Sequence, residues 1–297
     1  MRTAAASLPA MLAAPEVFTL GHSPDPDDAF MFYAMAENKI DLRGYKFEHR
    51  LEDIQKLNER ALRGELHISA ISIHAYAYVR DRYALLPCGA SMGDGYGPMV
   101  ISGDAPPLSG DDESREWLRS RTIAVPGKMT SAYLALQLYL GEFDFIVVPF
   151  DEVFDAVKSG RAAAGLIIHE GQLTYEQSGF KKIVDLGEWW KRDTGLPLPL
   201  GGNVLRKDIP SNVRRDLSSI LRESIEYGLA HRDEAVRHSM PYARDMDAPL
   251  ASQFIGMYVN EYTRDYGDAG RAAIREFLSR AETAGYLRRA VELEFVE

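Results

Sequence analysis

The chain of 297 residues lacks several features that define large classes of protein. Its one cysteine, Cys88, excludes an internal disulfide and a metal site built only of cysteines. No apolar run approaches the roughly 20 residues that a membrane-spanning helix needs. The 44 acidic side chains outnumber the 34 basic ones, and no basic stripe is present, so neither a membrane nor nucleic acid is an expected partner.

The N-terminal residues 1–14 carry one positive charge and an alanine-rich stretch that Pro9 interrupts. This pattern fits either a weak export signal or a disordered extension. We expect a disordered extension over residues 1–16, because the apolar part is short and no cysteine lies nearby to carry a lipid anchor. Without an export signal, the protein is expected in the cytoplasm.

Short apolar segments alternate with segments of helical spacing, which indicates an α/β protein. The first run predicts strands at 17–21, 45–51, 68–71 and 83–87, with helices at 29–38, 54–64 and 73–81. The second run predicts strands at 98–102, 122–125, 145–149 and 164–168, with helices at 130–140 and 153–159. Residues 104–112 are predicted as a surface loop, and the chain is predicted to be mainly helical after Ser211.

This order predicts two lobes. Lobe 1 comprises residues 17–101 and 200–297, and lobe 2 comprises residues 102–199. A stiff extended segment, 196–202, returns the chain to lobe 1. Two such lobes enclose a cleft that can close over a small molecule and exclude water. The C-terminal helices carry no assignable chemistry, and we expect them to pack or to form an interface that would support a homodimer.

The first candidate for catalysis is His169, which ends the apolar run Gly165-Leu-Ile-Ile. Ligands of open α/β sheets bind outside the carboxyl ends of the strands. Since an imidazole titrates near neutral pH, His169 is a candidate general base. The alternative is a structural histidine that only makes hydrogen bonds. His22, after the first predicted strand, is a secondary candidate.

The turn after the first strand carries three carboxylates, and its candidate ligand-binding residues are Ser23, Asp25, Asp27 and Asp28. One carboxylate can cap the following helix, and the others can face a ligand's hydroxyl groups. The spacing lacks the glycine and glutamate of a calcium loop, so no metal is expected. Capping alone is the alternative role.

Two further segments place small polar residues at strand ends. Thr130, Ser131 and Ala132 begin a predicted helix, where free N–H groups suit a carboxylate or phosphate. Ala70, Ile71 and Ser72 end another strand and leave space for a ligand. In both segments a hydroxyl could merely cap a helix. The glycine-dense segment 89–98 could be a hinge, a wall against a planar ligand, or a flexible loop.

At these residues the chain resembles the 1,4-dihydroxy-6-naphthoate synthase family of the futalosine route to menaquinone. The resemblance covers about residues 17–290. The motifs that carry it are Leu20-Gly-x-Ser-Pro-x-Pro-x-Asp28, Ser72-x-x-Ala-Tyr76-Ala, Arg80-Asp-Arg-Tyr-Ala-Leu85, Gly93-x-Gly-x-Gly-Pro98, Ala124-Val-Pro-Gly127, Ala132-Tyr133, Gly165-Leu-Ile-Ile-His-Glu170, Val184-Asp-Leu-Gly-x-Trp-Trp190 and Thr194-Gly-Leu-Pro-Leu-Pro-Leu-Gly201.

The resemblance implies a type II periplasmic-binding-protein-like fold with the ligand cleft between the lobes, and no cofactor. It implies a lyase that converts cyclic dehypoxanthine futalosine to 1,4-dihydroxy-6-naphthoate. The residue matching His169 would be the proton acceptor. Backbone and hydroxyl groups matching 70–72 and 131–132 would contact the ligand.

The chain departs from the family pattern at four of these positions. Asp25 and Asp27 replace the usual cysteine and asparagine, Ala70 replaces a frequent lysine, and Asp94 lies where a basic residue can occur. These changes predict a more acidic cleft. Two other functions remain open, namely a solute-binding protein of a transporter and a chorismate-dehydratase-like paralogue acting on another organic acid.

Overall fold

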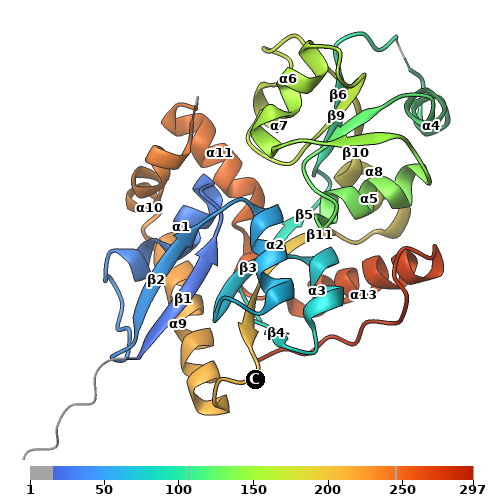
Figure 1. The fold of residues 1–297 in the computed structure, drawn as a ribbon. Coiled ribbons are helices and arrows are strands. Elements are labelled where there is room, and N and C mark those ends of the chain that lie inside the picture. Colours follow the sequence, from blue (N-terminus) through green and yellow to red (C-terminus); the bar gives the residue numbers. More distant parts are fainter. Residues whose placement is uncertain (1–15, 107, 245, 297) are drawn as a thin grey trace, which may run out of the picture.

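The computed structural model describes residues 16–106, 108–244 and 246–296. The predicted disordered extension therefore lies outside the described residues, apart from Glu16. The described part of the chain contains no helix that is long and apolar enough to cross a membrane. Its helices and strands form two α/β lobes, each built on its own sheet, as the alternation of segments predicts (Figure 1).

The first sheet has the strand order β2-β1-β3-β11-β4, with β5 paired to β11. Strand β1 pairs in parallel with β2 and β3, whereas β11 runs antiparallel to β3, β4 and β5. Its strands are β1 (Val17–His22), β2 (Lys46–Leu51), β3 (Ile68–Ser72), β4 (Tyr83–Leu85), β5 (Ser91–Gly93) and β11 (Leu198–Arg206). The predicted connection at 89–98 thus contains a strand.

The second sheet has the order β10-β6-β9-β7-β8. Its strands are β6 (Met99–Ser102), β7 (Ile123–Val125), β8 (Phe145–Val147), β9 (Ala164–Ile167) and β10 (Lys181–Asp185). All of β6 pairs within this sheet, with β9 and β10. The predicted lobe boundary between residues 101 and 102 therefore falls inside a strand, and the sheets place the crossing between Gly93 and Met99. The return crossing precedes β11.

Helices follow most strands. In the first lobe they are α1 (Pro26–Ala36), α2 (Ile54–Arg63) and α3 (Ile73–Val79); in the second they are α4 (Asp111–Arg119), α5 (Ser131–Leu140), the 3-10 turn η1 (Phe150–Glu152), α6 (Val153–Lys158), α7 (Gly171–Thr174) and α8 (Leu186–Thr194). Gly64 ends α2 in the left-handed conformation (φ 74°) that favours glycine. The predicted loop 104–112 ends earlier than expected, because α4 begins at Asp111.

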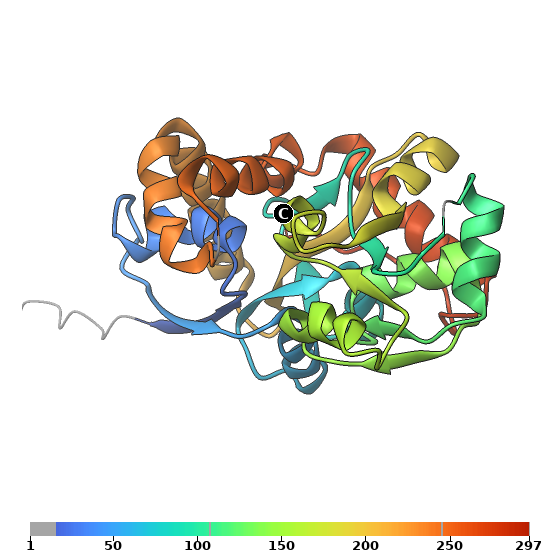
Figure 2. The ribbon, with the colours of Figure 1, turned by 90° about the horizontal axis from the view of Figure 1, so that it is seen from above.

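The C-terminal region returns to lobe 1. It contains α9 (Ser211–Ala230), α10 (Arg232–Ser239), the 3-10 turn η2 (Met240–Tyr242), α11 (Ala248–Tyr258), α12 (Glu261–Arg264) and α13 (Gly267–Thr283). Helices α9, α10 and α11 pack against α1. Figure 2 shows this group gathered at one end of the molecule, with the green elements of lobe 2 at the other. Helices α11 and α12 are separate, since the chain turns at Asn260, which caps α12.

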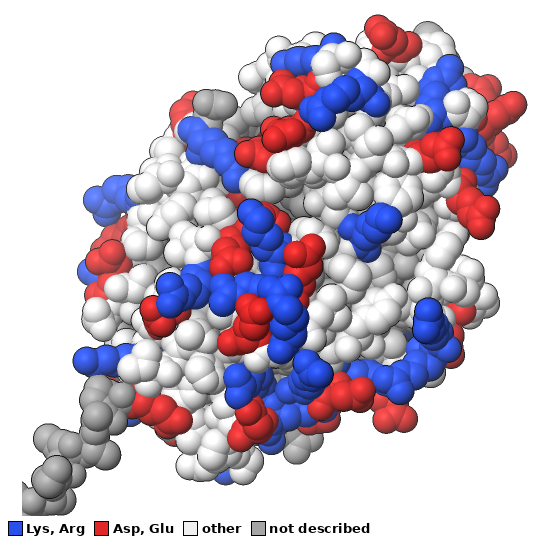
Figure 3. Space-filling model, viewed as in Figure 1, with Lys and Arg blue, Asp and Glu red and all other residues white. Residues whose placement is uncertain are grey.

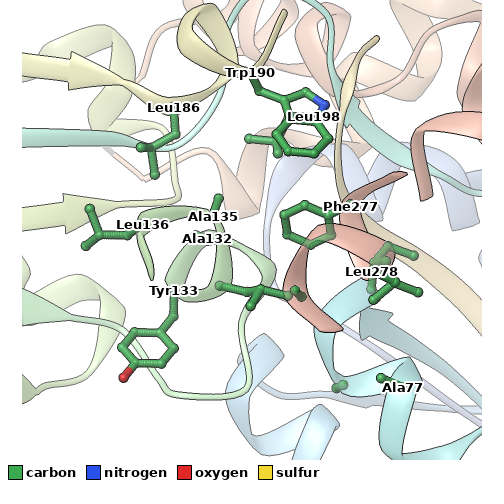
Figure 4. Packing of buried hydrophobic residues seen from close by; sticks show 14 of the residues in the cluster. Ala77, Ala132, Tyr133, Ala135, Leu136, Leu186, Trp190, Leu198, Phe277 and Leu278 are labelled. Carbon is green, nitrogen blue, oxygen red and sulfur yellow. The ribbon is translucent and has the colours of Figure 1, made fainter. Parts of the chain in front are cut away.

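The two lobes share one apolar cluster on the side of α5 and α13 (Figure 4). Lobe 2 contributes Leu136 and Trp190, and lobe 1 contributes Leu198 and Phe277. The rings of Trp190 and Phe277 meet edge to face with centroids 5.5 Å apart. Each large apolar side chain buried here stabilises the fold by about 1.5–3 kcal/mol, so this side of the molecule holds the lobes together.

Charged groups are mixed on the surface. On the face drawn in Figure 3, basic and acidic side chains alternate over lobe 1. Elsewhere on the surface, charged side chains form partly exposed ion pairs, such as Arg43 with Glu223. Exposed pairs of this kind contribute little to stability.

Candidate active site

A cavity of about 130 Å³ lies where the two lobes meet. Ten of the residues predicted to bind a ligand line it together: Ser23, Asp25, Asp27, Asp28, Ala70, Ile71, Ser72, Thr130, Ser131 and Ala132. They come from three separate segments of the chain: the turn from β1 into α1, the end of β3, and the start of α5 in lobe 2. The cavity is therefore formed by tertiary folding rather than by one local motif.

The carboxylates sit at the start of α1, directly after β1. Asp28 accepts a hydrogen bond from the Ser23 N–H (2.6 Å), and Asp25 accepts one from the Ser23 hydroxyl (2.8 Å). Asp25 is the residue before the helix, but its side chain makes no capping bond. The predicted alternative of capping alone therefore does not describe Asp25.

Burial changes the proton affinity of this cluster. It raises the pKa of Asp28 to about 7, and it raises the pKa of Asp27 well above the ordinary value, with the neighbouring Asp28 and Asp25 adding to the effect. Burial also raises the pKa of Asp25, while Arg244 opposes that rise. Part of the cluster is thus protonated near neutral pH, which lessens its repulsion toward an anionic ligand.

Thr130 and Ser131 begin α5, as predicted. The Thr130 hydroxyl accepts from the Tyr133 N–H (3.1 Å) and donates to the Gly127 carbonyl (2.9 Å), so it caps the helix. The Ser131 hydroxyl donates to the Leu200 carbonyl of lobe 1 (2.5 Å). Both hydroxyl protons are therefore used within the protein, and what the helix start offers a ligand is its first N–H groups, which have no acceptor inside the helix.

Asn58 of α2, a residue that the sequence patterns did not single out, fixes the other wall. Its amide accepts from the Ser72 N–H (2.8 Å) and donates to the Ser72 hydroxyl (2.9 Å) and to the Met129 carbonyl of lobe 2 (3.3 Å). Asn203 of β11 also lines the cavity, and its buried Oδ1 has no hydrogen-bond partner among the described residues. A polar atom in that state is available to a ligand donor.

His169 follows β9 at the lobe interface but does not belong to the cavity lining, which reaches only the preceding Ile168. The ring is buried against Phe150 and Phe154. Its Nδ1 accepts from the Gly171 N–H (3.0 Å), so the neutral ring carries its proton on Nε2. Burial lowers the pKa of His169, an effect that Glu170 opposes, so the ring is neutral at pH 7.

The residues that follow His169 are held by tight packing and by an ion pair. A Cβ on Gly171 would lie 2.8 Å from the His169 ring and 2.9 Å from the Phe154 ring, so only glycine fits. Glu170 extends toward Arg244, which donates to its Oε1 (2.7 Å). Arg244 also donates to Oδ1 of Asp25 (3.2 Å). No sequence pattern marked Arg244, because it lies 74 residues from Glu170.

One prediction about the surroundings needs correction. Asp94 does not line the cavity and pairs instead with Lys191 (2.7 Å), so the acidic residues of the cavity lining are Asp25, Asp27 and Asp28. Of the alternatives for the glycine-dense segment 89–98, a wall of the cavity fits Gly89 and Ser91, which line it. The segment is tightly folded at Gly93, where a Cβ would lie 2.0 Å from the Tyr96 carbonyl oxygen. Within the described residues, no group of three or more acidic, histidine or cysteine side chains is placed to hold a metal ion.

A second, larger hollow of about 790 Å³ lies on lobe 1, outside the interlobe cavity. His22, His49 and His238 line it, and the rings of His22 and His49 are joined by a hydrogen bond of 3.0 Å. His22 also contacts the Ser23 carbonyl (3.0 Å), so it turns away from the interlobe cavity. His22, the secondary catalytic candidate, therefore supports the loop before α1 from behind.

Comparisons with known proteins identify the family of this chain. A family described as menaquinone biosynthesis matches residues 18–283. The 1,4-dihydroxy-6-naphthoate synthase of Thermus thermophilus is 38% identical over 91% of this chain and 96% of its own length, and that of Streptomyces coelicolor is 37% identical over 91% and 94%.

Solved structures give the fold. A protein of Archaeoglobus fulgidus superposes with a TM-score of 0.85 at 41% identity, covering 91% of this chain and 98% of that one. The periplasmic aliphatic sulphonate-binding protein of Escherichia coli shares only the fold, with a TM-score of 0.66 at 10% identity and coverage of 93% and 95%. The chain therefore has the predicted periplasmic-binding-protein-like fold, and it belongs to the 1,4-dihydroxy-6-naphthoate synthase family of menaquinone biosynthesis.

Proposed function

We propose that this protein is a carbon–carbon lyase that converts cyclic dehypoxanthine futalosine to 1,4-dihydroxy-6-naphthoate in the cytoplasm. The observation that carries the proposal is the polar cavity shared by both lobes beside the His169–Glu170 turn. Similarity over nearly the whole chain to two synthases of that name supports it. No resident cofactor is part of the proposed reaction.

Two parts of the cavity lining would suit the two ends of this substrate. The first turn of α5, at Ser131 and Ala132, would receive the aromatic carboxylate, because free N–H groups and the helix dipole favour an anion there. Asp25, Asp27 and Asp28 would accept hydrogen bonds from the hydroxyl groups of the sugar-derived part. This arrangement keeps the anionic end of the substrate away from the carboxylates.

His169 would act as the general base that removes a proton from an acidic carbon; the C–C bond then breaks and aromatisation of the ring drives the reaction. Its ring must first turn so that Nδ1 leaves the Gly171 N–H, because the nitrogen that lacks a proton is engaged there. Lowered proton affinity keeps the ring in the basic, neutral form at pH 7. General base catalysis contributes about 10²–10⁴-fold.

The test incubates the purified protein with cyclic dehypoxanthine futalosine and follows the products by mass spectrometry. We expect the naphthoate from wild type and a loss of at least about 100-fold in His169→Asn. Wild-type turnover by that variant would remove His169 as the base. Binding of the compound without any product would instead support a solute-binding protein, and dehydration of a chorismate-like acid would support the paralogous activity.

A further inference from the structure

One arginine joins the two lobes beside the cavity, away from the shared apolar core. Arg244 lies between η2 and α11 in lobe 1 and donates to Asp25 of the same lobe (3.2 Å) and to Glu170 of lobe 2 (2.7 Å). Its guanidinium also covers the Phe150 ring at 4.7 Å. Its backbone has φ +43°, a conformation that most residues avoid, so the local chain is bent to place this residue.

This bridge lies opposite the apolar core that the lobes share. The core surrounds α5 and α13, whereas the bridge lies where α11 meets α7, on the other side of the ribbon in Figure 1. Close to it, the Tyr258 hydroxyl of α11 donates to Oε1 of Gln172 in α7 (2.5 Å). An opening of the lobes about the core side would therefore have to separate Arg244 from Glu170.

The bridge ends on the residue next to His169. Glu170 is 7% exposed, and its Oε1 accepts from Arg244. Its other oxygen, Oε2, is buried, has no hydrogen-bond partner within the part of the chain that the structure describes, and lies 3.7 Å from Nδ1 of His169. A buried carboxylate whose only cation is removed becomes an uncompensated charge, which is costly and acts on its neighbours.

The charged groups that face the His169 ring come from several elements. Glu170 is adjacent in the chain, Arg244 approaches from lobe 1, and Asp151 lies on η1. The carboxylates favour the protonated ring, and Arg244 disfavours it. Arg244 is the only cation among these groups.

We propose that Arg244 is a positioning residue: by pairing with Glu170 across the cleft, it holds the 169–171 turn in place and compensates the buried carboxylate of Glu170 beside the His169 ring. The kinetic consequence rests on the proposed function, because it needs His169 to be the base. The structural consequence, the ionisation of His169, does not depend on that role.

The experiment measures His169 directly in protein labelled with ¹⁵N-histidine, with its ring signals assigned by their absence from His169→Asn. In Arg244→Gln we expect the titration midpoint of His169 to rise by about 1 pH unit, and in Glu170→Gln we expect it to fall. Arg222→Gln is the matched control, since Arg222 also pairs with a carboxylate, Asp265 (3.2 Å), but lies within lobe 1. It should leave the midpoint unchanged.

Kinetics give the second readout. In Arg244→Gln the acid limb of kcat/KM should move up with the titration midpoint and kcat should fall about tenfold, while Arg244→Lys should restore part of both. Asp25→Asn, which removes only the lobe 1 end of the bridge, should raise KM more than it lowers kcat. If Arg244→Gln does not fold, Glu170→Gln serves as the test variant, because it removes the other partner of the same pair.

A His169 midpoint that is the same in Arg244→Gln, Arg222→Gln and wild type would overturn the inference. If His169→Asn turns over normally while Arg244→Gln still shifts the midpoint, the general base fails and the positioning role stands. A shifted midpoint with an unshifted acid limb leads to the same conclusion.

Discussion

The side-chain amide of Asn58 holds Ser72 at two points, accepting from its N–H (2.8 Å) and donating to its hydroxyl (2.9 Å). Both residues are buried, and Asn58 also reaches the Met129 carbonyl in the other lobe. One amide thus fixes the end of β3 and joins the lobes at the edge of the cavity.

We expect Asn58→Ala to lower the free energy of unfolding by about 1–3 kcal/mol, because it leaves the buried Ser72 N–H without a partner. The Michaelis constant should rise as the cavity wall at Ser72 loosens. Urea denaturation and steady-state kinetics measure the two effects. Asn212→Ala, on the exposed start of α9, is the control; equal stability of the two variants would contradict the assigned role of Asn58.

The crossing segment before β6 packs so closely on α8 that a side chain cannot be added. A Cβ on Gly187 would lie 1.9 Å from the Tyr96 carbonyl oxygen, a backbone atom that can move only with its whole segment. We expect Gly187→Ala to destabilise the protein by about 3 kcal/mol.

Gly103→Ala is the control for this prediction, since a Cβ there meets no atom within 4 Å. It should change stability by less than about 0.5 kcal/mol. Thermal unfolding of the two variants measures the difference in their stability. A Gly187→Ala protein as stable as Gly103→Ala would mean that the crossing segment is loosely packed.

The hydroxyl of Thr130 caps α5, so removing this hydroxyl should destabilise the helix. We expect Thr130→Val to cost about 1 kcal/mol, because the Tyr133 N–H loses its acceptor, whereas Thr130→Ser should cost much less. The shift of the urea midpoint measures both. Should the two variants prove equally stable, the capping role would be wrong.

Burial lowers the pKa of His22 from 6.5 to about 4. Between those values the unfolded chain binds more protons at this site than the folded one, so His22 makes stability fall as the pH falls through that window. Asp28 acts in the opposite sense, because burial raises its pKa and favours the folded state at low pH. The test is therefore a comparison between variants.

We expect His22→Asn to lose about 1–2 kcal/mol less stability than wild type between pH 7 and pH 5. Urea midpoints at the two pH values give the difference. His231→Asn, at an exposed position on the same lobe, should follow wild type. A His22→Asn protein with the wild-type pH dependence would show that His22 is not held neutral by burial.

Local sequence patterns predicted much of the secondary structure, because apolar spacing and helix caps act within a few residues. The turn at Ser23–Asp28, the start of α5 at Thr130 and the end of β3 at Ser72 are all set in this way, and the predicted ligand-binding residues could be chosen from them. Local patterns did not predict strands that form only through pairing with a distant strand. Strand β5 forms because it pairs with β11, more than 100 residues away along the chain.

The amino-acid sequence alone determined the alternation of strands and helices and the fact that the chain crosses between two lobes. It also determined which small polar groups lie at strand ends, since each of these features follows from local spacing. Only the tertiary structure decided that Asn58 and Arg244 reach across the lobes, that Asp94 faces away, and that His169 is set behind the cavity with Nδ1 engaged. These outcomes depend on contacts between distant segments, which local propensities do not encode.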